Sequence, residues 1–180
     1  MTRLAILSTA LGCAIILGRL PLLLVPERAR EWIRLFPRSK WAGRVIAAVD
    51  YVWVGVLLAT TPLGWFDEWK MVLWVLVPIA YALTIEFVDE LLAARALGGF
   101  ALLLATPVLN AAQWHPSDAR VVVTVLAYLW VVAGMVLVVS PYWLRKSAAF
   151  WIASNQRCRL GALLGMVVGA GLLALGLFVY

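Results

Sequence analysis

Charge is scarce in this chain, and so are the residues that most often carry catalysis or bind metals. Only 13% of the 180 residues are charged and 65% are hydrophobic, with one histidine and two cysteines. A soluble domain is about half apolar and about a quarter charged. Because a core surrounded by water could not bury so much apolar side chain, we expect the solvent to be largely lipid.

The sequence also lacks the motifs that mark enzymes and metal centres. Cys13 and Cys158 form no CxxC pair, and His115 has no second histidine beside it. No GxSxG, P-loop, HExxH or dinucleotide-binding pattern occurs. We therefore expect no catalytic residue, metal or cofactor. A membrane-embedded lipid enzyme is the least favoured class, since no evident acid–base set is present.

Long apolar runs dominate the rest of the chain. A transmembrane helix needs about 20 apolar residues, with a range of about 17–25. Six segments qualify, namely 4–25, 45–63, 71–92, 96–112, 121–139 and 160–179. Polar residues interrupt the third and fourth, so these two could instead form a shallow hairpin. The sequence predicts an all-α integral membrane bundle, one domain over 1–180, with about six transmembrane helices arranged as hairpins.

The basic residues indicate how such a bundle is oriented. Eleven Lys and Arg residues lie in the connections 26–44, 86–95 and 140–159, against three on the other side. Cytoplasmic loops carry the excess of Lys and Arg, which places both termini outside. We expect a multi-pass protein, typical of a bacterial inner membrane. The same clustering argues against nucleic-acid binding.

Two of the basic connections have the pattern of amphipathic helices that lie on the membrane surface. In the segment 27–41, Ala29, Trp32, Ile33 and Phe36 recur at helical spacing, and arginines occupy the other face. The segment 142–155 can do the same with its aromatic residues.

The two surface segments also suggest an internal repeat. A shift of 115 residues aligns two prolines, two serines and two pairs of arginines: Pro26 with Pro141, Ser39 with Ser154, Arg30 with Arg145, and Arg44 with Arg159. The prediction is a parallel repeat of 1–64 and 116–180, with 65–115 as a middle hairpin. Simple duplication of a hairpin is the alternative.

Asp50 is the first candidate site, because an ionisable group inside a span is costly and usually faces protein or water. Arg19 and Asp50 each lie six residues from the same predicted surface, about 9 Å deep at a rise of about 1.5 Å per residue. Matching depth on antiparallel spans predicts an intramembrane ion pair. Two separate interfacial groups, or a proton or ion relay, are the alternatives.

A second candidate is the acidic cluster EFVDE. Glu86, Asp89 and Glu90 share one helical face at the inner end of a span. We interpret the cluster as part of a salt network with the cytoplasmic arginines. Binding of a cation or a proton is the alternative.

Glycines supply the third pattern. Gly161, Gly165 and Gly169 form two consecutive GxxxG steps, a stripe suited to close helix contact. Gly134 is the first candidate neighbour, and at the shift of 115 residues Arg19 and Asp50 fall on Gly134 and Gly165. The stripe could instead contact a second chain.

These patterns favour a non-catalytic membrane protein that acts by association, as an accessory or scaffolding subunit of a larger complex. The expected partners are membrane lipids and other membrane subunits or a second copy of the chain. A small transporter or channel for a proton, ion or small solute is the alternative, with the charged residues along its path.

Overall fold

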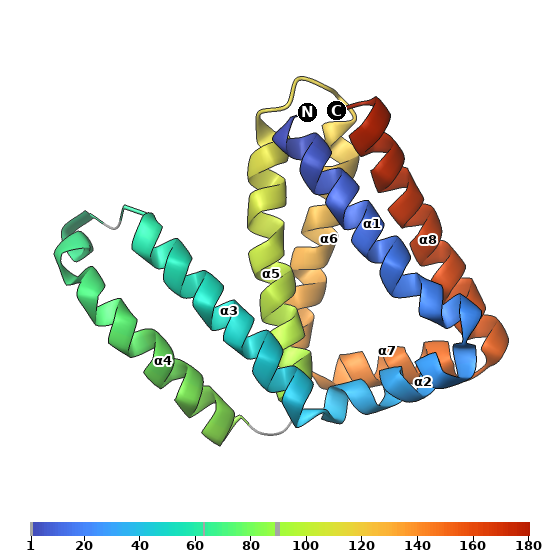
Figure 1. Ribbon diagram of the computed structural model, residues 1–180, viewed down its shortest axis with the longest axis horizontal. Coiled ribbons are helices and arrows are strands. Elements are labelled where there is room, and N and C mark those ends of the chain that lie inside the picture. Colours follow the sequence, from blue (N-terminus) through green and yellow to red (C-terminus); the bar gives the residue numbers. More distant parts are fainter. Residues whose placement is uncertain (1, 63, 89–90) are drawn as a thin grey trace.

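A computed structural model describes residues 2–62, 64–88 and 91–180, and these residues are almost entirely helical (Figure 1). Within them no strand occurs, which confirms the all-α prediction. The helices are α1 (Arg3–Leu24), α2 (Pro26–Leu35), α3 (Lys40–Thr60), α4 (Lys70–Phe87), α5 (Leu92–Gln113), α6 (Arg120–Val139), α7 (Tyr142–Ile152) and α8 (Asn155–Phe178). Two short 3-10 segments, η1 (Phe36–Arg38) and η2 (Gly64–Trp69), complete the described chain.

Six of the helices, α1, α3, α4, α5, α6 and α8, are long and apolar enough to cross a membrane. Where the predicted first residue of a long helix differs most from the observed one, the cause is local. The helices α3 and α8 each begin five residues before the predicted span, because Ser39 and Ser154 cap them by accepting bonds from the backbone N–H groups of Ala42 and Arg157. Apolar character marks the part of a helix suited to lipid, whereas capping marks where the helix begins.

The helices α2 and α7 lie side by side at the end of the molecule opposite the two termini (Figure 1). Pro26 is the first residue of α2, and Pro141 directly precedes α7. Ala29 of α2 is buried, whereas Trp32 is 78% exposed. Both predicted amphipathic segments are therefore helical, and both begin at the prolines that the repeat aligned. The repeat itself stays a prediction.

Four of the long helices form the main body of the molecule. The helix α1 lies along α8, and α5 lies along α6 (Figure 1). A core cluster that includes Leu4, Val108, Val123 and Leu172 joins all four near the termini. Towards the other end the two pairs diverge, and α2 and α7 bridge the space between them. This divergence creates the hollow part of the fold.

The helices α3 and α4 lie outside this body. The helix α3 contacts α5 on one side and α4 on the other, and no residue of α4 is buried. The predicted hairpins of consecutive spans are therefore wrong in all three cases: α1 is paired with α8 rather than α3, α3 separates α4 from α5, and α6 is paired with α5 rather than α8 (Figure 1). A rigid helix of 10 residues spans about 15 Å, so α2 carries α3 away from α1.

Candidate functional site

A groove of about 1000 Å³ runs between α2 and α7. Its lining is strongly basic, with six cationic side chains against the two carboxylates of Glu27 and Glu31. The cations are Arg28, Arg30, Arg34, Arg38, Arg145 and Lys146.

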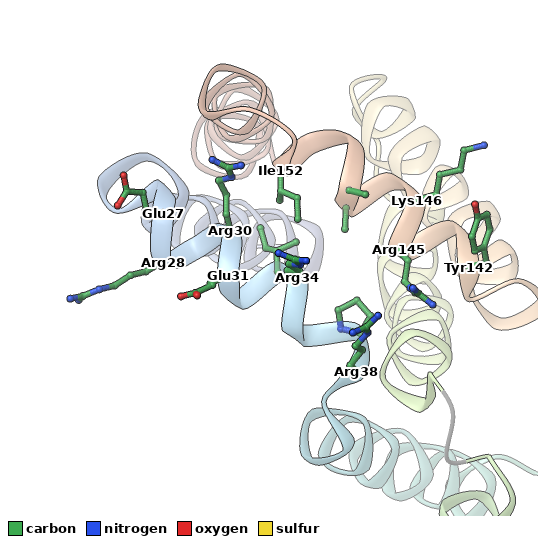
Figure 2. A pocket seen from close by; sticks show the side chains of 14 residues that line it. Glu27, Arg28, Arg30, Glu31, Arg34, Arg38, Tyr142, Arg145, Lys146 and Ile152 are labelled. Atoms are coloured by element: carbon green, nitrogen blue, oxygen red, sulfur yellow. The ribbon is translucent and has the colours of Figure 1, made fainter.

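The arginines of α2 reach the groove because of their spacing. Arg30 and Arg34 lie four residues apart in α2, which keeps them near one face of that helix, and Arg38 follows after the same interval in η1. Figure 2 shows Arg34 and Arg145 extending into the space between α2 and α7, whereas Glu31 points away from α7. The middle of the groove is therefore cationic, and the carboxylate of Glu31 does not neutralise it.

Behind the groove lies a second, mostly apolar cavity of about 490 Å³. It is lined by α1, α2, α6, α7 and α8, and its walls include the rings of Trp130 and Trp151. Ile33, Ala148 and Ile152 line both the groove and the cavity. The two hollows are thus adjacent, one charged and one apolar.

Arg19 lines this apolar cavity and lies against α8. A Cβ atom added at Gly165 would lie 2.6 Å from Nε of Arg19, so the missing side chain at Gly165 makes room for the guanidinium. Sequence reasoning singled out both residues but missed that they meet. The shift of 115 residues aligned Gly165 with Asp50, not with Arg19.

The predicted ion pair between Arg19 and Asp50 is not formed in this structure. Arg19 packs on α8, whereas Asp50 packs on Gly99 of α5, where an added Cβ would lie 3.1 Å from Oδ2. Figure 1 shows α1 and α3 on opposite sides of α5 and α6. The prediction assumed that consecutive spans are neighbours, and the pairing of α1 with α8 removes that premise.

Asp50 is left with an unsatisfied carboxylate. Its Oδ1 atom is buried and has no hydrogen-bond partner, and no cation in the described part of the chain pairs with it. The neighbouring contacts of α3 are apolar or aromatic, with Trp53 edge-to-face against Phe100 at 6.0 Å between ring centroids.

The glycine stripe of α8 contacts neighbours within the chain, as the first interpretation held, but not through Gly134. Gly169 lies against Gly12 of α1, where an added Cβ would meet the Gly12 carbonyl oxygen at 3.1 Å. Gly161 lies against the ring of Trp151. The backbone of Gly134 instead approaches Gly98 of α5, and an added Cβ would lie 2.9 Å from its carbonyl oxygen.

The acidic cluster is described only in part. Glu86 is exposed near the end of α4, whereas Asp89 and Glu90 lie outside the described residues. Elsewhere in the described chain, no three His, Cys, Asp or Glu residues are grouped as metal ligands. The proposed salt network of this cluster remains a prediction.

Comparison with known proteins adds no relative: no family model, no curated protein and no solved structure matches the chain.

Proposed function

We propose that the chain is a non-catalytic integral membrane protein that acts by association, as an accessory or scaffolding subunit. The observation that carries this proposal is the unsatisfied carboxylate of Asp50 in a helix long and apolar enough to cross a membrane. Ionisable groups at that depth pair with one another or with protein dipoles, because lipid solvates them poorly. A cationic side chain on a transmembrane helix of another protein would satisfy Asp50.

The surroundings of Asp50 fit such a partner. Gly99 leaves the carboxylate without a side chain opposite it on α5. The helix α3 packs on α5, with the backbone of Gly43 against that of Ala93, whereas α4 lies beyond α3 and has no buried residue. A second helix could approach α3 and α4 from outside, and to reach the buried Oδ1 atom of Asp50 it would have to enter beside α3 next to Gly99.

The proposal requires the chain to cross the membrane with both termini outside. In a variant without Cys13 and Cys158, a cysteine introduced in place of Glu68 should react with an impermeant thiol reagent from outside. A cysteine in place of Arg38 should react only from inside, because the basic connections face the cytoplasm. Labelling of both positions from the same side would contradict the six-span topology.

Photo-crosslinking tests the association itself. A crosslinking residue at Val54, one helical turn beyond Asp50, should capture one discrete membrane protein in intact cells. The same residue at Val167, 70% exposed on α8, is the control and should capture lipid only. Asp50→Leu should abolish the crosslink from Val54, and Asp50→Glu should keep it. The captured protein should carry a transmembrane Lys or Arg whose exchange with Asp50 restores the complex.

If the crosslink from Val54 persists in Asp50→Leu, the captured protein does not bind through Asp50. The carboxylate would then no longer support the proposed association. Lipid crosslinks alone from both positions would contradict association on this side of the molecule.

An unsatisfied carboxylate could also serve the alternative function, a small transporter or channel for a proton or ion. A proton or ion path would need further free polar groups beside α3, but the hydroxyls of Tyr51 and Thr84 bond to each other. Thr60 and the C-cap residue Thr61 donate their hydroxyls to backbone carbonyls of α3. Purified protein in liposomes should therefore show no proton or cation flux that depends on Asp50. A flux abolished by Asp50→Leu would favour the transporter.

A further inference from the structure

We propose that the groove between α2 and α7 and the apolar cavity behind it form one binding site for a single anionic phospholipid. The phosphate would lie in the groove, and the first part of an acyl chain would enter the cavity. This site is separate from Asp50 and does not depend on a protein partner.

The charge of the groove selects a phosphate. Arg34 and Arg145 extend into the groove from the two opposite helices (Figure 2). A guanidinium donates two parallel hydrogen bonds to a phosphate, which makes arginine the preferred residue for such groups. Because Glu31 points away from α7, the central cations lack the anionic partner that a bound phosphate would supply.

The cavity selects an amphiphile over a free anion. Ile33, Ala148 and Ile152 line both hollows, so apolar surface continues from the phosphate position into the cavity. Beyond them the cavity is bounded by apolar side chains such as Leu22 and Leu164, and Arg19 is the one charged residue that the described chain contributes to its lining. A free phosphate would leave this surface unused, whereas an acyl chain would cover it.

The position in the fold matches the place of a lipid headgroup. The groove lies at the end of the molecule predicted to be cytoplasmic, between two helices whose exposed aromatic residues suit the membrane interface. Trp32 is 78% exposed on α2, and the Lys146 ammonium lies 4.8 Å from the ring centroid of Trp143 on α7. The volumes of about 1000 and 490 Å³ fall within the usual range of ligand sites, about 300–1,000 Å³.

Native mass spectrometry of the full chain in a neutral detergent tests the site. Phosphatidylglycerol, phosphatidylcholine with the same acyl chains, and inorganic phosphate are the probes. One phosphatidylglycerol should remain bound at least about tenfold more tightly than phosphatidylcholine, since only the former carries net charge. Inorganic phosphate in large excess should not displace it. Displacement would overturn the lipid proposal in favour of a free-anion site, and equal retention of both lipids would overturn the role of charge.

Two charge-matched double variants test the groove. Arg34→Gln with Arg145→Gln should weaken phosphatidylglycerol binding by about tenfold or more, because each cation near the headgroup contributes directly. Arg95→Gln with Arg159→Gln makes the same change in net charge at two exposed side chains that line neither the groove nor the cavity. This control should weaken binding by less than about threefold, since exposed distant charges are screened. Equal losses would show diffuse surface attraction and overturn the site.

The cavity has its own test, which stays decisive if the arginine variant does not fold. Ala148→Phe fills the boundary between the two hollows and should weaken phosphatidylglycerol binding by about tenfold with every arginine retained. Ser147→Phe is the control, because Ser147 is exposed on the same helix and lines neither hollow. Unchanged binding in Ala148→Phe, with a melting temperature like that of the control, would show that no chain enters the cavity.

Discussion

The main body and the α3–α4 hairpin are both built from helices apolar enough to cross a membrane, but they are held together in different ways. In the body, α1 meets α8 and α5 meets α6 through glycines that bring backbones close together, as at Gly12 with Gly169 and Gly98 with Gly134. In the hairpin, the hydroxyl groups of Tyr51 and Thr84 form a hydrogen bond of 2.6 Å. No residue of α4 is buried.

The difference shows what replaces the hydrophobic effect between helices in lipid. Apolar surface gains little by leaving lipid for another apolar helix, so close packing and interhelical hydrogen bonds decide which helices associate. The body uses close packing, and so does the contact of α3 with α5 at Gly43 and Ala93. In contrast, no residue of α4 is buried, and α4 is held to α3 by side chains such as Tyr51 and Thr84. We therefore expect the body to be the stable part and the hairpin to be the part available for a partner.

The largest expected effect comes from adding one methyl group to the body. In Gly12→Ala the new Cβ would lie 2.7 Å from the Gly169 carbonyl oxygen and 2.8 Å from the Leu173 amide nitrogen, and these backbone atoms cannot move aside cheaply. The free energy of unfolding in mixed micelles should fall by about 1–3 kcal/mol. Gly18→Ala is the control in the same helix, because nothing lies within 4 Å of its added Cβ. Equal effects of the two variants would contradict close packing of α1 on α8.

A smaller effect is expected in the hairpin. Tyr51→Phe removes the hydrogen bond to Thr84 but keeps the ring that packs edge-to-face on Tyr81 at 5.8 Å. Such bonds contribute about 0.6 kcal/mol on average between helices in membranes. Hydrogen exchange of the α4 amides should therefore speed up about two- to threefold, with the body unchanged. The control is Tyr128→Phe, since Tyr128 is 58% exposed on α6. Faster exchange in α1 or α8 instead would contradict the separation of the two parts.

The smallest expected effect is a coupling near zero between Arg19 and Asp50. Because the two residues lie in different parts of the molecule and share no partner, Arg19→Leu and Asp50→Leu should change the free energy of unfolding additively, within about 0.5 kcal/mol. A double-mutant cycle in mixed micelles measures the coupling. Asp50→Leu alone should stabilise the isolated chain, because it removes an unsatisfied buried oxygen. A favourable coupling free energy well above about 0.5 kcal/mol would instead support the ion pair that the sequence predicted.

Local features were readable from the sequence alone. Six apolar runs predicted the six long helices, and amphipathic spacing with a preceding proline predicted α2 and α7. These elements depend on residues within about 20 positions of one another, so apolar runs, helical periodicity and prolines suffice to locate them. The charged residues worth testing were also visible, because a carboxylate inside an apolar run is unusual whatever surrounds it.

Only the tertiary structure decided which helices are neighbours. Helices that are apolar on nearly every face carry little information about their partners, and the glycines that could supply it fit more than one surface. Chain order suggested α3 as the neighbour of α1, but the structure pairs α1 with α8, and this choice separates Arg19 from Asp50. The groove depends on the same choice, because it joins α2 and α7, which are distant in sequence. Local sequence made both basic surface helices, and the packing of the long helices placed them side by side.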